Sequence, residues 1–130
     1  MNNVIAIHQP NFFPWLGYFD KIKKADIFVF LDSVQYPKSS KSMGSWCNRV
    51  KLNVGGEGKW ISCPVKREKG IQLIQNVVIN NQMPWREEFL ETLEANYKKA
   101  LNYGEGRCFL EELTQFQTDS LADFNIQGIQ

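Results

Sequence analysis

The sequence has no long hydrophobic run, no block of like charge and no excess of either sign of charge. The apolar run near the N-terminus, VIAI, is four residues long, far short of a signal sequence or a membrane span. The formal net charge is +1, so bulk electrostatics give no reason to expect nucleic acid as the main partner. We therefore expect a cytoplasmic protein that neither inserts into membranes nor binds nucleic acid.

Cysteine and histidine are also scarce, and their placement excludes several kinds of site. The three cysteines form no CxxC pair and there is one histidine, so a structural zinc site is not expected. We expect reduced thiols, with Cys47 and Cys63 acting as small buried hydrophobic residues. No GxGxxG follows the first predicted strand and no GxxxxGK[ST] occurs, so a dinucleotide fingerprint and a P-loop are both unsupported. The sequence identifies no cofactor.

What is present suits one α/β domain over residues 1–130. The chain is 43% hydrophobic and 13% aromatic, enough to fill one compact core. Residues 4–7 and 27–31 are continuous apolar runs that predict strands buried on both faces, as in a parallel sheet. Apolar residues at helical spacing predict a helix over residues 14–25 between them. This order is the βαβ signature and predicts a Rossmann-like parallel core.

The rest of the chain predicts a hairpin insertion and C-terminal helices. A polar, basic loop covers residues 32–46, and the turn sequence NVGGEG between residues 46–52 and 59–65 indicates a β-hairpin. Residues 71–80 look like another strand. The predicted helices lie over residues 84–100, from Trp85, Phe89, Leu93 and Tyr97, and after NYGEG, from Phe109, Leu113, Phe116, Leu121 and Phe124. The chain stops at DFNIQGIQ without a capping signal, so we expect a further element beyond it.

Polar side chains follow both strands of the predicted parallel pair. In open parallel sheets, ligands bind outside the carboxyl ends of the strands. The side chains at these two ends are His8, Gln9, Asn11, Asp32, Gln35 and Tyr36. If the strands are neighbours, these groups face one crevice. Residues a little further on could supply positive charge; they are Lys38, Lys41, Asn48, Arg49 and Lys51. We therefore expect an anionic small molecule, such as a phosphate, a carboxylate, or a nucleotide or nucleotide sugar.

Each candidate also has a structural interpretation. His8 can act as a general acid or base, or it can hydrogen-bond the backbone and close the loop. Asp32 can orient His8 or hold a metal, or it can cap a turn before SVQY. Asn48 and Arg49, in the predicted hairpin, fit surface residues. The aromatic side chains of the first loop and helix fit the core better than a stacking surface; they are Phe12, Phe13, Trp15, Tyr18 and Phe19.

The motifs resemble one known family. The stretch IHQPNFFPWLGYFDKIKKADIFVFLDSVQY, followed by SWCNRVKL, KWISCPV and MPWREEFLETLEANYKKA, is similar to the WbqC-like proteins over essentially the whole chain. The resemblance implies a bacterial cytosolic protein of O-antigen or other surface-polysaccharide biosynthesis. Transfer of an acyl or aminoacyl group to an amino sugar is one candidate reaction. Carried over residue by residue, the motif singles out His8, Gln9, Pro10, Asn11, Pro14, Trp15, Asp32, Gln35, Tyr36, Asn48 and Arg49.

The leading hypothesis that follows is a transferase. In it, His8 and Asp32 are catalytic, and the substrate-binding residues are Gln9, Asn11, Trp15, Gln35, Tyr36, Asn48 and Arg49. Ser33 stands where the family usually has a second acidic residue, so a two-carboxylate metal site is not expected. The family's usual chains are longer, and we expect this chain to lack their C-terminal portion. The alternatives are a non-catalytic nucleotide- or sugar-binding module, and a partner subunit or oligomer that docks through the C-terminal edge.

Overall fold

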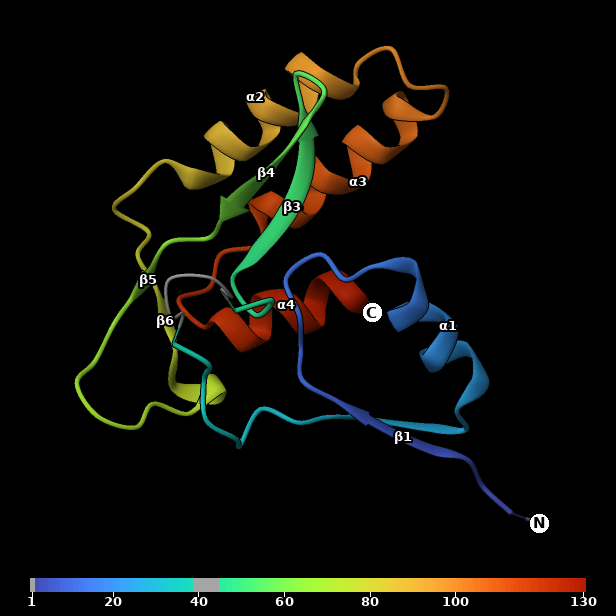
Figure 1. The fold of residues 1–130 in the computed structure, drawn as a ribbon, viewed down its shortest axis with the longest axis vertical. Coiled ribbons are helices and arrows are strands. Elements are labelled where there is room, and N and C mark those ends of the chain that lie inside the picture. Colours follow the sequence, from blue (N-terminus) through green and yellow to red (C-terminus); the bar gives the residue numbers. More distant parts are fainter. Residues whose placement is uncertain (1, 39–44) are drawn as a thin grey trace.

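The computed structural model describes residues 2–38 and 45–130, so residues 39–44 of the predicted polar loop lie outside the described part. The fold is mixed α/β, with small two-stranded sheets and four α-helices among the described residues (Figure 1). In chain order, the elements are β1 (Ile5–His8), α1 (Leu16–Lys24), β2 (Ile27–Phe30), β3 (Arg49–Val54), β4 (Glu57–Ser62), β5 (Val65–Lys66), the 3-10 helix η1 (Ile74–Asn76), β6 (Val78–Ile79), α2 (Trp85–Tyr97), α3 (Tyr103–Gln115) and α4 (Leu121–Ile129).

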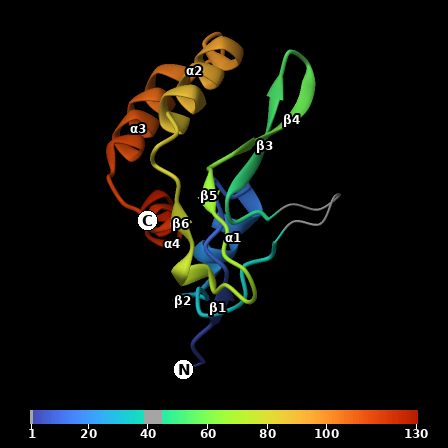
Figure 2. The ribbon, with the colours of Figure 1, turned by 90° about the vertical axis from the view of Figure 1, so that its left-hand side faces the viewer.

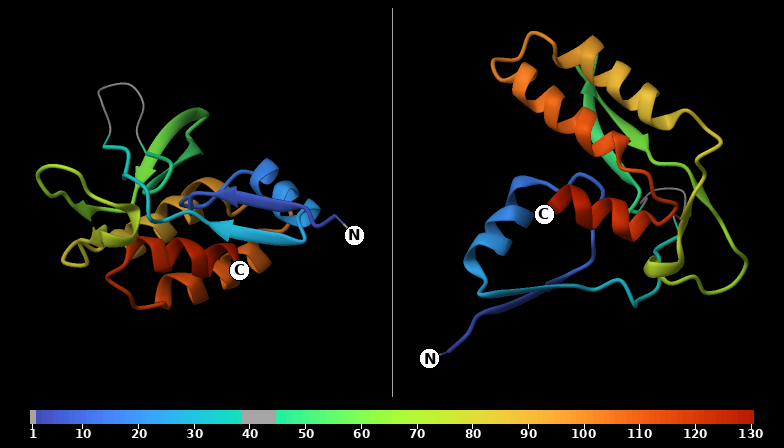
Figure 3. Two further views of the ribbon diagram at one scale, coloured as in Figure 1. Left: turned by 90° about the horizontal axis from the view of Figure 1, so that it is seen from below. Right: turned by 180° about the vertical axis from the view of Figure 1, so that it is seen from behind.

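Strands β1 and β2 are parallel and are connected by α1, which confirms the predicted strand–helix–strand order. The two strands lie side by side in Figure 3, with His8 at the end of β1 paired with Phe30 of β2. One face of the pair packs on α1, where the ring of Tyr18 lies 5.6 Å from that of Phe28. The apolar runs and the helical periodicity were therefore sufficient to identify this unit.

The Rossmann-like core predicted from that order is not confirmed. Across residues 2–38 and 45–130, parallel pairing is limited to β1 and β2, and the other sheets are antiparallel pairs. The predicted burial of both strand faces is also wrong, because the face opposite α1 is open. Its side chains are 59% exposed at Ile5, 52% at Ile7, 47% at Ile27 and 40% at Val29. A continuous apolar run allows burial on both faces, but only a second covering layer produces it.

Strands β3 and β4 form the predicted hairpin, with six residue pairs from Arg49 opposite Ser62 to Val54 opposite Glu57. The two turn residues, Gly55 and Gly56, have φ angles of 62° and 88°. Such a two-residue turn needs positive φ at both positions, and glycine adopts it without a Cβ clash. Alternate residues of the hairpin pack on the hydrophobic core; they are Val50, Leu52 and Ile61.

The strand predicted over residues 71–80 is mostly wrong. The segment forms η1 and then the two-residue β6, which pairs with β5. It is held by the segment that precedes α4, because Ile79 N–H donates to the Asp119 carbonyl at 2.8 Å and Leu121 N–H donates to the Val77 carbonyl at 3.1 Å. These partners lie about forty residues further along the chain, so local periodicity does not report them.

Helix α2 confirms the helix predicted over residues 84–100, whereas the helix predicted after NYGEG is two helices. Helix α3 already begins at Tyr103, within that sequence, and ends at Gln115 before α4 begins. The Ser120 hydroxyl caps α4 by accepting a hydrogen bond from the Asp123 N–H at 3.2 Å. Serine followed three residues later by an acidic residue is an N-terminal signal that was present in the sequence.

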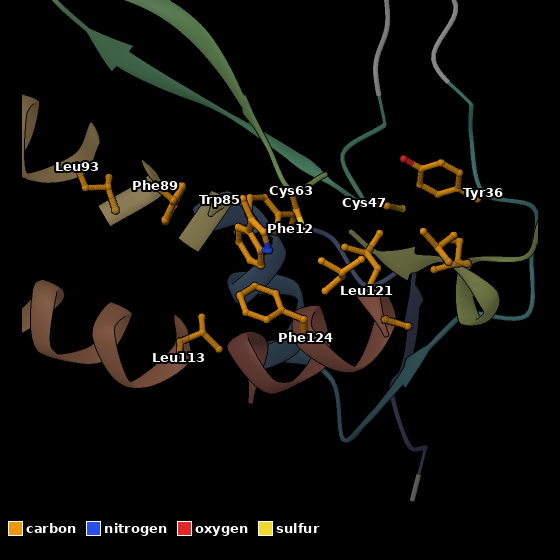
Figure 4. Packing of buried hydrophobic residues seen from close by; sticks show 14 residues of the cluster. Phe12, Tyr36, Cys47, Cys63, Trp85, Phe89, Leu93, Leu113, Leu121 and Phe124 are labelled. Carbon is orange, nitrogen blue, oxygen red and sulfur yellow. The ribbon is translucent and has the colours of Figure 1, made fainter. Parts of the chain in front are cut away.

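The hydrophobic core lies between the hairpin and helices α2, α3 and α4, and Phe12 is at its centre (Figures 2 and 4). The Phe12 ring lies 5.9 Å from Phe89, 6.0 Å from Phe124 and 6.1 Å from Trp85. Its neighbour Phe13 has a φ of 45°, the left-handed region that non-glycine residues rarely adopt, and stacks on Phe89 at 4.8 Å. Both phenyl rings therefore anchor the loop after β1 in the core.

The side-chain amide of Asn125 connects this loop to the rest of the core. It is 3% exposed, and its Nδ2 donates to the carbonyls of Pro10 at 3.0 Å and Cys47 at 2.7 Å. Since both partners can only accept, the amide orientation is determined. Helix α4 thus holds the loop after β1 and the segment before β3 at one point.

Replacing Asn125 by Ala should lower the free energy of unfolding by about 2–4 kcal/mol, because two buried carbonyls lose their donor. Chemical denaturation of both proteins measures the difference. Gln127→Ala, at an exposed position of the same helix, is the matched control and should have little effect. Equal stabilities for Asn125→Ala and the control would contradict the structural role assigned to the amide.

Candidate functional site

His8, the last residue of β1, is half-buried and its ring orientation is determined by the adjacent backbone. Its Nδ1 lies 3.0 Å from the Gln9 carbonyl oxygen, which also accepts a hydrogen bond from the Tyr18 hydroxyl at 2.8 Å. A carbonyl oxygen can only accept, so this contact requires the proton of neutral His8 on Nδ1. The lone pair of Nε2 is then available to receive a proton.

Tyr18 stabilises this arrangement from helix α1. Its side chain is 1% exposed, and its ring lies edge-on to that of His8, with 4.7 Å between centroids. Burial raises the pKa of Tyr18 well above its usual value, and the Coulomb effect of Cys47 adds to this increase. The hydroxyl therefore stays protonated and remains a hydrogen-bond donor to the Gln9 carbonyl.

Asp32 does not orient His8. Among the described residues, no hydrogen bond joins the two side chains, and the ring contact of His8 is with the Gln9 carbonyl. Asp32 instead fixes the chain beyond β2, because its carbonyl accepts a hydrogen bond from the Gln75 N–H at 2.9 Å. The sequence pattern predicted that the Asp32 carboxylate could orient the His8 ring. In the structure, the carbonyl of the next residue, Gln9, orients it.

Three exposed tryptophans extend from His8 towards the hairpin, and we call them the tryptophan surface: Trp15, Trp46 and Trp60. The Trp15 ring lies 6.0 Å from His8 and 6.1 Å from Trp46, which lies 5.1 Å from Trp60. Their exposed fractions are 51%, 48% and 41%. The assignment of Trp15 to the core is therefore wrong, as is that of Phe19, which is 37% exposed, although Phe12 and Tyr18 are buried as expected. Trp46 and Trp60 were missed, because no local pattern connects them to His8.

Two cations lie at the far end of the tryptophan surface. The guanidinium carbon of Arg49 is 4.2 Å from the centre of the Trp60 ring, and Lys51 Nζ is 5.9 Å from it. Lys51 is paired with Trp60 across the hairpin, and Arg49 is two residues along the same strand, so all three share one face of the sheet. Arg49 was a predicted binding residue, and this position joins it to Trp15 through Trp46 and Trp60.

The other predicted binding residues have different surroundings. Gln9 is half-buried, with Oε1 3.8 Å from the Cys47 thiol, and Asn48 Nδ2 donates to the Cys63 carbonyl at 3.0 Å. Asn11 and Tyr36 are buried, at 4% and 2% exposure, and burial raises the pKa of Tyr36 to about 12. Gln35 is exposed and forms a β-bridge with Leu73. Of the predicted site residues, ring contacts therefore join His8, Trp15 and Arg49 along the tryptophan surface.

Cys47 and Cys63 are buried, as predicted. Burial raises the pKa of both thiols, that of Cys63 to about 12, so neither is a thiolate at neutral pH. Within residues 2–38 and 45–130, no three His, Cys, Asp or Glu side chains come together as a metal site. No helix in the described part of the chain is both long and apolar enough to cross a membrane.

Comparison with known proteins gives a family but no established activity. The sequence model of the WbqC-like protein family matches residues 9–130. A Mycobacterium tuberculosis protein described as "Uncharacterized protein Rv1507c" is 33% identical over 102 residues, which are 78% of this chain and 42% of that protein. The chain thus spans less than half the length of the curated relative it matches. No solved structure matches it.

The tautomer of His8 can be measured directly, because it is the single histidine of the chain. We expect neutral His8 to carry its proton on Nδ1, held there by the Gln9 carbonyl. Ring nitrogen shifts from 15N-labelled protein at alkaline pH, where the ring is neutral, report which nitrogen is protonated. The denatured chain is the control, since the carbonyl no longer holds the ring. A proton found mainly on Nε2 in the folded protein would rule out this geometry.

Proposed function

The chain belongs to the WbqC-like protein family, and on that premise we propose that it is an enzyme of bacterial surface-polysaccharide or unusual-sugar biosynthesis. The observation that supports the proposal most is the geometry of His8. Its Nδ1 is engaged by a backbone carbonyl, its Nε2 is left as a proton acceptor, and an exposed indole lies beside it. An oriented imidazole beside an aromatic surface is suited to general base catalysis on a sugar.

Transfer of an acyl or aminoacyl group to an amino sugar is the reaction that we propose. The amine nitrogen of the sugar attacks the acyl carbon, a carbon–nitrogen bond forms, and the bond between the acyl carbon and its carrier breaks. His8 Nε2 accepts the proton that the amine loses and returns it to the leaving carrier. The role of His8 is thus to hold and move one proton, while Gln9 and Tyr18 keep its ring in place.

Replacing His8 by Ala should lower the transfer rate about a hundredfold or more, the usual contribution of a general base. The assay incubates the chain with nucleotide-linked amino sugars and acyl thioesters and detects the acylated sugar by mass spectrometry. His8→Asn is the informative companion, because its side-chain N–H can replace the Nδ1 donor but supplies no base. A rate that is unchanged in His8→Ala, with an unchanged melting temperature, would falsify the catalytic role. Binding of the sugar by the native chain without any product would favour a non-catalytic binding module.

A second candidate function is favoured by a separate observation. The face of β1 and β2 opposite α1 exposes four aliphatic side chains: Ile5, Ile7, Ile27 and Val29. Contiguous apolar surface of this kind marks interaction sites in soluble proteins. The C-terminal helix, in contrast, buries Leu121, Ala122 and Phe124 in the core. A role as a partner subunit would therefore use the β1–β2 face rather than the C-terminal edge.

If two copies of the chain cover this face, sedimentation velocity should show a dimer at micromolar concentration. Val29→Lys should dissociate it, because burying an unpaired ammonium is unfavourable. Lys23→Ala, at an exposed position of α1, should leave the association unchanged. A monomer for the native chain at every concentration would exclude self-association as the function of this face.

A further inference from the structure

We propose that the tryptophan surface, together with Arg49 and Lys51, is the binding site for a nucleotide sugar, with the diphosphate at the arginine end and a ring stacked on the indoles. The nucleotide sugar bound there would be the substrate of the proposed enzyme, so this inference rests on the proposed function. Neither Trp46 nor Trp60 was singled out by the motif, and both follow from the structure alone. Four observations support the site: the exposure of the three indoles, the angles between their rings, the charges of Arg49 and Lys51, and the position of Gly17.

The exposure of the three indoles is the first observation. Trp15, Trp46 and Trp60 are each between 41% and 51% exposed, whereas the remaining tryptophan, Trp85, is 4% exposed. Adjacent exposed indoles form an apolar patch of the kind that marks a binding site on a soluble protein. The chain therefore keeps most of its tryptophan at one place on its surface, where neighbouring indole rings contact each other.

The ring geometry is the second observation. The planes of Trp15 and Trp46 are inclined by 58°, and those of Trp46 and Trp60 by 68°. Inclined rings do not cover one another, so each indole keeps exposed π surface for a ligand, apart from the face of Trp60 against which Arg49 lies. Any nucleobase can stack on such a face, and a sugar can direct its C–H groups towards the face. Three inclined faces can hold a base and a pyranose at successive positions.

The charge at the hairpin end is the third observation. No hydrogen bond or ion pair within residues 2–38 and 45–130 uses the guanidinium of Arg49 or the ammonium of Lys51; both lie against Trp60. Arg49 Nε is moreover a buried donor that has no partner among the described residues. A guanidinium presents its donors in a planar fork that matches phosphate oxygens. Two cations suit a diphosphate, whereas the net charge of +1 does not suit a nucleic-acid backbone.

Gly17 in helix α1 is the fourth observation, and it explains how Trp15 is placed. A Cβ at Gly17 would lie 2.8 Å from Trp15 Nε1 and 3.1 Å from Cδ1, so any side chain there must displace the indole. Glycine is unfavourable inside a helix compared with alanine. Its presence at this position leaves the room in which the Trp15 ring lies beside His8 and Trp46. Gly17 is therefore a positioning residue for the site.

Isothermal titration calorimetry of the native chain with UDP-, dTDP-, GDP- and ADP-linked sugars, all of which carry a diphosphate, tests the proposal. We expect at least one of them to bind more tightly than its free sugar. Trp60→Ala should weaken that binding by about tenfold, the usual contribution of one stacked ring. Arg49→Gln should weaken binding of the charged ligand and leave binding of the free sugar unchanged. Lys59→Ala, on the opposite face of β4 from Trp60, is the control and should change the affinity by less than about twofold.

The Gly17→Ala variant tests whether the position of the Trp15 ring matters, because it displaces the ring without removing it. The variant keeps every ring of the site and improves helix propensity, so its melting temperature should not fall. Its affinity for the nucleotide sugar should nevertheless fall by about tenfold, because the Trp15 face is displaced. Native affinity in both Gly17→Ala and Trp60→Ala, or no binding of any of the four nucleotide sugars, would overturn the proposed site. Binding as expected together with unchanged turnover in His8→Ala would instead overturn the catalytic role and leave this site standing.

Discussion

A single buried amide, that of Asn125, holds together parts of the chain that are far apart in sequence. Its two hydrogen bonds reach Pro10, 115 residues away, and Cys47, 78 residues away. The surface that carries His8 and the three exposed tryptophans depends on both attachments, because His8 lies two residues before Pro10 and Trp46 lies one residue before Cys47. Helix α4 contributes no side chain to that surface, yet it determines where the two segments meet.

The loop after β1 alternates between the core and the surface, and this alternation places the side chains of the candidate site. Phe12 and Phe13 enter the core among the rings of α2 and α4, at the cost of a positive φ at Phe13. With both rings anchored, the chain directs Trp15 outwards onto α1, where Gly17 leaves space for it. His8, on the other side of the same loop, is held by the Gln9 carbonyl. The burial of the Phe12 and Phe13 rings thus holds the loop in the conformation that leaves Trp15 exposed.

Local patterns in the sequence predicted those elements whose cause is local. The apolar runs around α1, the glycine turn of the hairpin and the periodicity of α2 each depend on residues within a few positions, and all three elements were predicted. The open face of β1 and β2, the short β6 and the division of the last helices were not. For β6, the deciding contacts come from segments that are distant in sequence. For β1 and β2, the decisive fact is that no second layer of the described residues covers the face opposite α1.

By itself, the sequence determined that the single imidazole ends a strand, next to a loop that can bring it near other side chains. It also determined the family, through motifs that the family comparison bears out. Only the tertiary structure decided that the Gln9 carbonyl, and not Asp32, orients His8, and that Trp15, Trp46 and Trp60 share one surface with Arg49. The physical reason is that hydrogen-bond direction and ring contacts depend on packing between distant segments, which no spacing along the chain records.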